Sequence, residues 1–349
     1  MMRLTGRISM AVSLSTDRRA KDASEKLKSA RYNPNLWKIL RNRYMESRLP
    51  GLTLVCLLLS VVHAQAQLLP ATLASRAAVP AVGGLSIDDV VVAMNGHSSV
   101  EAKLRQKIQL FGEPLVGTGK YAQQGRGTEM LVRLELQMQV AGQVGSLLEV
   151  GDGRYLWRDQ QMPSGRRVSR IDLRQVFAHL AQQQADNPGN RLAVPIGQYL
   201  ALGGLPKMLA VLADNFEFVA PAESHIGDVP VYVLRGVWRP DRLAVVLAGG
   251  STEAEGEKPV DLDDVPEHVP HEVVLLVGRD DLFPYRIEYL GKALRAASDR
   301  GDGRRRQVLL RMELYEVRLG TPIDTREFAY KPQTAVEHDT DAFIGRLVP

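Results

Sequence analysis

The segment Gly117–Lys120, with the sequence GTGK, contains residues that could hold a phosphate group. A phosphate-binding loop needs a glycine five residues before the glycine that precedes the lysine, and a serine or threonine after the lysine. Those two positions hold Pro114 and Tyr121. The spacing therefore favours a glycine-containing strand over a nucleotide site.

Other polar clusters are equally incomplete as catalytic or metal sites. His268 and His271 follow several acidic residues and could ligate a divalent ion, but Pro266 and Pro270 flank them, which favours a solvated loop. The sequence Asp299–Gly303 begins like a calcium loop, and three arginines follow it where acids are needed. There is no Gly-x-Ser-x-Gly motif. We therefore predict no enzyme activity, no cofactor and no metal, with an enzyme kept as the least favoured function class.

Charge is distributed unevenly along the 349 residues. The formal charge is +4, but residues 1–66 hold 12 Lys+Arg and only 4 Asp+Glu, so the remainder is net acidic. The composition, with 45% hydrophobic and 24% charged residues, is that of a globular protein. Because the basic surplus is confined to the leader, we predict no nucleic-acid partner.

Residues 1–66 have the features of a leader with a secretory signal. Leu49–Val62 is an uncharged apolar run, shorter than the roughly 20 residues of a spanning helix. Ala64–Ala66 then fits a signal-peptidase site, which predicts cleavage after Ala66, and Met45 is the predicted true start. An uncleaved signal that anchors the protein in the inner membrane is the alternative. The only cysteine, Cys56, lies within this run, so the mature chain would have no disulfide and no thiolate site.

Beyond a tether rich in Ala, Pro and Gly at residues 67–84, the clearest pattern is a strand at 129–140. Apolar and polar side chains alternate there, which is typical of an antiparallel sheet with one buried and one solvated face. The buried face should carry Met130, Val132, Leu134, Leu136 and Met138, and the solvated face Arg133, Glu135 and Gln137.

The remaining pattern predicts an α+β domain on this sheet. Ser86 should cap a helix over 87–94, and Gly203–Pro206 should interrupt a helix over 196–212. An acidic segment with three prolines, 250–272, should be a mobile loop. The other expected elements are a strand at 100–110, a hairpin at 147–157, strands at 229–238, 273–277, 285–290, 307–317 and 326–330, and helices at 172–184, 241–247 and from 339 or 340 to 347.

Four segments, taken in order, resemble the LolA-like periplasmic lipoprotein and lipid carriers. They are Val100–Leu110, Asp152–Trp157, Phe283–Tyr289 and Phe328–Pro332. The resemblance covers residues 86–349 and implies a domain at 85–349 with an unclosed antiparallel β-barrel, or half-barrel, whose concave face is covered by helices. The family's Arg-Pro pair after the second long strand is absent, because Gln139–Gly142 occupies that region.

The resemblance implies a periplasmic carrier that holds lipid or lipoprotein acyl chains in a hydrophobic cavity, with an envelope membrane protein as a further partner. A filled core and a non-enzymatic interaction or sensor module on the same scaffold are the alternatives. Burial of each methylene contributes about 0.8 kcal/mol, so a sixteen-carbon chain, at on the order of 12 kcal/mol, would not diffuse freely through water without a carrier. The expected lining consists of apolar residues from five strands, namely Met130, Val132, Leu134, Leu136, Met138, Leu148, Val150, Tyr155, Trp157, Ile287, Tyr289, Leu310, Met312 and Leu314.

Overall fold

A computed structural model describes the chain at residues 63–64, 84–110, 113–140, 143–186, 194–247, 265–266, 269–294 and 305–345. The chain divides into two compact units, Met1–Thr53 and Leu54–Pro349, and every described residue belongs to the second. Most of the predicted leader, tether and acidic loop lies outside the described residues, and those predictions stay untested.

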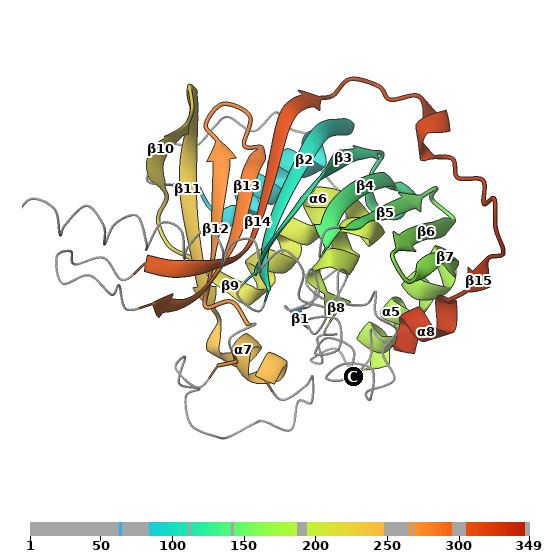
Figure 1. Cartoon of the computed structure of the whole chain (residues 1–349). Coiled ribbons are helices and arrows are strands. Elements are labelled where there is room, and N and C mark those ends of the chain that lie inside the picture. The colour runs from blue at the N-terminus through green and yellow to red at the C-terminus, as the bar shows by residue number, and fades with distance from the viewer. Residues whose placement is uncertain are drawn as a thin grey trace, which may run out of the picture. The chain divides into compact units, whose positions relative to one another are not determined.

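One large antiparallel sheet dominates the second unit (Figure 1). Its order is β10-β11-β12-β13-β14-β2-β3-β4-β5-β6-β7-β15, with β9 beside β10 on β11. Only β15 pairs in parallel. The edge strands β10 and β15 do not pair with each other, so the sheet is an unclosed barrel, as predicted. Its strands are β2 Ser99–Leu110, β3 Glu113–Gln124, β4 Leu131–Val140, β5 Gln143–Gly151, β6 Tyr155–Met162, β7 Gly165–Asp172, β9 Phe216–Phe218, β10 Ala222–Ile226, β11 Val229–Trp238, β12 Glu272–Gly278, β13 Pro284–Leu294, β14 Arg305–Leu319 and β15 Glu337–His338.

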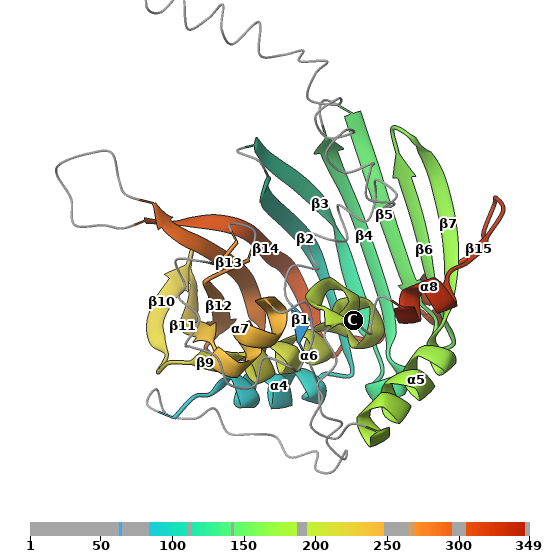
Figure 2. The same ribbon diagram turned by 90° about the horizontal axis from the view of Figure 1, so that it is seen from below.

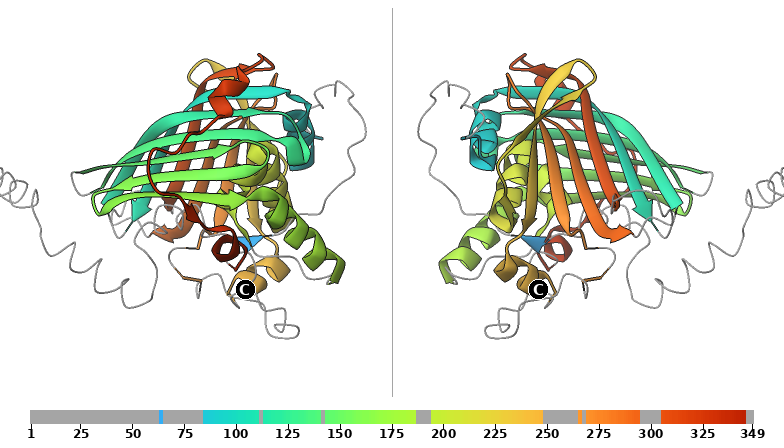
Figure 3. Two further views of the ribbon diagram at one scale, coloured as in Figure 1. Left: turned by 90° about the vertical axis from the view of Figure 1, so that its right-hand side faces the viewer. Right: turned by 90° about the vertical axis from the view of Figure 1, so that its left-hand side faces the viewer.

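Helices lie on one side of this curved sheet, which we call the inner face (Figures 2 and 3). The central helix is α6, Ile196–Asn215, which contacts β4 and β5. Helix α4, Ile87–Gly96, packs on α6 and begins at the predicted cap, where Ser86 and Asp89 form a capping box. The others are α5 Leu173–Asp186, α7 Pro240–Leu247 and α8 Thr340–Gly345. A separate two-residue pair joins β1, His63–Ala64, to β8, Val194–Pro195.

The predicted alternation of β4 is confirmed. Val132, Leu134, Leu136 and Met138 are buried in the main core, and Gln137 is exposed. On the outer face Arg133 and Glu135 are half-buried and form an ion pair with a 2.7 Å Nη2–Oε1 distance.

The glycine of the GTGK segment has a structural role in this sheet. Gly119 pairs with Leu136, and a Cβ atom at Gly119 would lie 1.8 Å from the Glu135 carbonyl oxygen. The strand prediction for GTGK is therefore confirmed, since the segment is part of β3.

The C-terminal region differs from the predicted strand at 326–330. After β14 the chain forms a strap, residues 320–338, that contacts the outer face and pairs with β7 through β15 (Figure 3). Instead of a strand it contains a short 3-10 helix, η4 Thr325–Phe328, which Asp324 caps. Glu327 accepts a hydrogen bond from Arg133, and the Tyr330 hydroxyl donates to Asp159. In this segment, side-chain capping and packing take the place of the backbone hydrogen bonds between strands. The alternation of residues at 326–330 therefore led to the wrong prediction of a strand.

The structure also differs at the end of the predicted acidic loop. Val265 and Val269 belong to the main core, and the Trp238 indole donates to the Pro270 carbonyl oxygen at 2.6 Å. The expectation of an unpacked segment through residue 272 is wrong at this end, because two valines supply buried apolar area that outweighs the local polarity.

Candidate functional site

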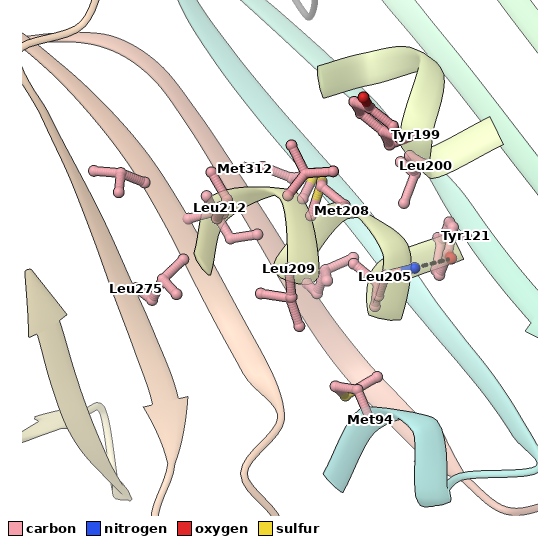
Figure 4. Packing of buried hydrophobic residues seen from close by; sticks show 14 of the residues in the cluster. Met94, Tyr121, Tyr199, Leu200, Leu205, Met208, Leu209, Leu212, Leu275 and Met312 are labelled. Atoms are coloured by element: carbon pink, nitrogen blue, oxygen red, sulfur yellow. Dashed lines mark hydrogen bonds between the residues drawn. The ribbon is translucent and has the colours of Figure 1, made fainter. Parts of the chain in front are cut away.

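The inner face of the sheet carries a large cluster of buried apolar side chains, to which α6 also contributes (Figure 4). The strand register brings ten of the fourteen expected lining residues together in one buried cluster with α6. These ten are Met130, Val132, Leu134, Leu136, Met138, Ile287, Tyr289, Leu310, Met312 and Leu314.

The other four expected residues, Leu148, Val150, Tyr155 and Trp157, are not on this face. Leu136 pairs with Leu147, so Leu148 points to the outer face, where it pairs with Glu135. Val150 pairs with Trp157 on that same outer face. The expectation that these four residues share the inner face is therefore wrong. Because residues 147 and 148 are both leucine, the sequence alone could not decide which of the two points to the inner face.

Trp157 and Tyr155 instead form part of a covered outer surface. The Trp157 indole donates to Asp152 at 3.0 Å, and its ring lies 5.6 Å from that of Tyr330 in the strap. The Arg170 guanidinium lies over both the Tyr155 and the Trp157 ring. These contacts hold the β6–β7 region against the strap.

Helix α6 supplies inner-face residues that the list from the strands missed. Leu205, Met208, Leu209 and Leu212 of α6 are buried in the same cluster as Leu275 and Met312 of the sheet (Figure 4). Their signal in the sequence was a helix that is apolar on nearly all sides, which indicates a buried helix. These side chains therefore fill the inner side of the sheet together with the strand residues.

The helix is broken in its middle, at the predicted position. Gly203 and Gly204 have non-helical backbone angles, and Gly204 has a φ of 67°. A Cβ atom there would lie 2.5 Å from Gln123 Oε1 and 3.0 Å from the Tyr121 hydroxyl. Glycine is required on both grounds, since the left-handed region and the close approach each exclude a side chain.

A small polar cluster on β3, which we call the latch, holds this break. The Leu205 amide donates to Gln123 Oε1 at 2.9 Å and to the Tyr121 hydroxyl at 3.1 Å. The Tyr121 hydroxyl in turn donates to Gln123 Oε1 at 2.6 Å. Burial raises the pKa of Tyr121, so the hydroxyl stays protonated and remains a donor. The latch satisfies the backbone amide that the broken helix leaves free.

A second polar feature lies on the inner face towards β6. Glu149 and Arg158 are 4% and 8% exposed, and Arg158 Nε donates to Glu149 Oε1 at 2.7 Å. Phe343 of α8 packs within the same core, with its ring centroid 6.0 Å from the guanidinium carbon of Arg158. The two opposite charges of this pair offset each other.

The described residues contain no cluster of three or more His, Asp or Glu side chains that could hold a metal ion. Among the described helices none is long and apolar enough to cross a membrane. The arrangement that remains is a large apolar face, a broken helix over it and a few buried polar groups.

No protein-family model matches the sequence, and no curated protein matches it significantly. The chain is similar to several solved structures. With lipoprotein LppX from Mycobacterium tuberculosis it shares 9% identity and a TM-score of 0.34, over 68% of this chain and 95% of that one. With a putative outer membrane lipoprotein-sorting protein domain from Vibrio parahaemolyticus it shares 10% identity and a TM-score of 0.28, over 69% of this chain and 94% of that one. With a LolA superfamily protein from Nitrosomonas europaea it shares 12% identity and a TM-score of 0.25, over 71% of this chain and 99% of that one.

Proposed function

We propose that this protein is a non-enzymatic carrier that holds acyl chains of a lipid or lipoprotein against the inner face of its sheet. One observation carries the proposal: the large apolar cluster of the inner face packs against a helix that is broken at Gly203–Gly204 and held at that break by the latch. A helix with a built-in break can move as two pieces, and the latch offers few hydrogen bonds to oppose this movement.

The energetics are compatible with exchange between helix and ligand. A sixteen-carbon chain gains on the order of 12 kcal/mol on burial. Uncovering a leucine or methionine side chain costs about 1.5–3 kcal/mol. Displacing the four α6 residues Leu205, Met208, Leu209 and Leu212 therefore costs about 6–12 kcal/mol, which is of the same order as the gain from one bound chain.

The leader supports an exported location for such a carrier. Cleavage after Ala66 would place the mature protein in the periplasm, where an envelope membrane protein could supply or receive its cargo. That cleavage would also remove β1, which contacts α6 and α7 in this structure, and so would free part of the helix surface.

Tryptophan fluorescence tests the proposal directly. After cleavage the chain retains Trp157 and Trp238. Trp238 belongs to the main core, with its ring 4.3 Å from Phe216, whereas Trp157 lies on the outer face. Titration with a lysolipid should therefore change the tryptophan emission of wild type and of Trp157→Phe. The emission of Trp238→Phe should hardly change.

Native mass spectrometry of protein purified from its own envelope is the second measurement, and bound lipid is the expected result. A protein that carries no lipid and shows no emission change at saturating lysolipid would overturn the proposal. The interaction or sensor module would then be the better account of the same packed core.

A further inference from the structure

Tyr289 carries a buried hydroxyl group that the protein itself leaves unused. The residue lies on β13 with Val273 and Leu310 as its two neighbours across the strands, and it is 9% exposed. Among the described residues no group hydrogen-bonds to its hydroxyl oxygen. A buried polar group without a partner is uncommon and destabilises the fold, so its presence needs a reason.

Two other tyrosine hydroxyls of the sheet, one buried and one half-buried, do have partners. The Tyr121 hydroxyl donates within the latch, and the Tyr285 hydroxyl donates to Asp281 at 2.7 Å. A phenylalanine would fill the Tyr289 position without the cost of an unpaired hydroxyl. The difference therefore points to a partner that the folded chain does not supply.

The local backbone and chemistry define what that partner must be. The pairing of β13 with β14 shifts register directly after Tyr289, the kind of irregularity that re-aims a side chain. Burial raises the pKa of Tyr289, so the hydroxyl remains a proton donor. Its cross-strand neighbours are apolar, so a charged acceptor would be costly here and a neutral oxygen fits.

We propose that the Tyr289 hydroxyl donates a hydrogen bond to a carbonyl oxygen of an ester-linked acyl chain held on the inner face. This inference rests on the proposed carrier function and narrows its ligand to acyl esters. Gln106, which is 2% exposed and pairs with Met312 and Gly117, is a second buried polar side chain on the same face.

A pair of lipids that differ only in the carbonyl group tests the inference. 1-Monopalmitoylglycerol and 1-O-hexadecylglycerol have the same head group and chain length, and each would displace a fluorescent apolar probe from the protein. Wild type should bind the ester about three- to tenfold more tightly than the ether, the range for one neutral hydrogen bond. Tyr289→Phe should remove this preference and leave the affinity for the ether unchanged.

The outcomes separate this inference from the carrier function. If both lipids bind wild type but Tyr289→Phe keeps the ester preference, or wild type shows none, the Tyr289 assignment is wrong and the carrier stands. If neither lipid displaces the probe, the carrier function itself fails.

Thermal unfolding of the lipid-free protein gives an independent readout. Tyr289→Phe should melt at the same temperature as wild type or higher, because it removes an unpaired buried hydroxyl. Tyr121→Phe is the matched control and should melt lower, because it removes two of the three hydrogen bonds of the latch. A comparable loss in both variants would show that the Tyr289 hydroxyl has a protein partner in solution, and would overturn the proposal.

Discussion

Leu136 lies in the middle of the inner face, paired with Gly119 on one side and Leu147 on the other, and is 2% exposed. Leu136→Asp should lower the free energy of unfolding by about 4 kcal/mol or more, because it leaves a cavity and buries a carboxylate without a partner. Gln137→Asp, on the exposed face of the same strand, should change it by less than about 0.5 kcal/mol. Urea unfolding measures both, and similar losses would contradict the face assignment.

The Glu149–Arg158 pair differs from Leu136 in that both of its side chains are charged as well as buried. Glu149→Gln breaks this ion pair by removing one of its two buried charges, so it should destabilise the protein by about 3–5 kcal/mol. The double variant Glu149→Leu/Arg158→Met replaces the pair with apolar side chains and should recover most of that loss. Urea unfolding of the single and double variants compares the two, and a double variant as unstable as the single one would indicate that the pair organises its surroundings.

The break in α6 makes an element-level prediction. Gly204→Ala should lower the melting temperature markedly, because it combines a strained positive φ with a clash against Gln123 Oε1. Gly127→Ala is the matched control, since Gly127 has a φ of 56° and nothing within 4 Å of its Cβ position. The control should show the backbone cost of about 1–2 kcal/mol alone. Equal losses in the two variants would mean that the latch does not constrain the helix.

These elements also show what sequence reasoning could predict. The long strands, the Ser86 cap and the α6 break were predictable because alternation, capping residues and Gly-Pro sequences act within a few residues. The inward-facing side of the β5–β6 hairpin could not be predicted, because either Leu147 or Leu148 could face the core. Only the pairing of Leu136 with Leu147 decides between them. The latch was also hidden, since Tyr121 and Leu205 are 84 residues apart.

The strap should respond to acid through Asp159. A hydrogen bond from Arg166 lowers the pKa of Asp159, burial opposes this, and the Tyr330 hydroxyl lowers it further. A carboxylate with a depressed pKa stabilises the fold above its unfolded value, about 3.9, and this contribution is lost as pH falls through the folded value. Trp157, which contacts Tyr330, should therefore change its emission below about pH 4. Asp159→Asn should flatten that change, and an unaltered profile would place the acid response elsewhere.

The leader and the folded domain are expected to be separable. Residues before Gln67 contribute to the described structure only through β1, a two-residue pair with β8, and every strand of the large sheet begins at Ser99 or later. Protein exported from cells should therefore begin at Gln67, which N-terminal sequencing would determine. A purified chain of residues 67–349 should melt within a few degrees of the full chain, because so short a pairing contributes little to a sheet of 13 strands. A mature protein that keeps residues 49–62 would instead be membrane-anchored. If 67–349 failed to fold, β1 would have a structural role that its two residues do not suggest, and cleavage after Ala66 would not be compatible with a stable carrier.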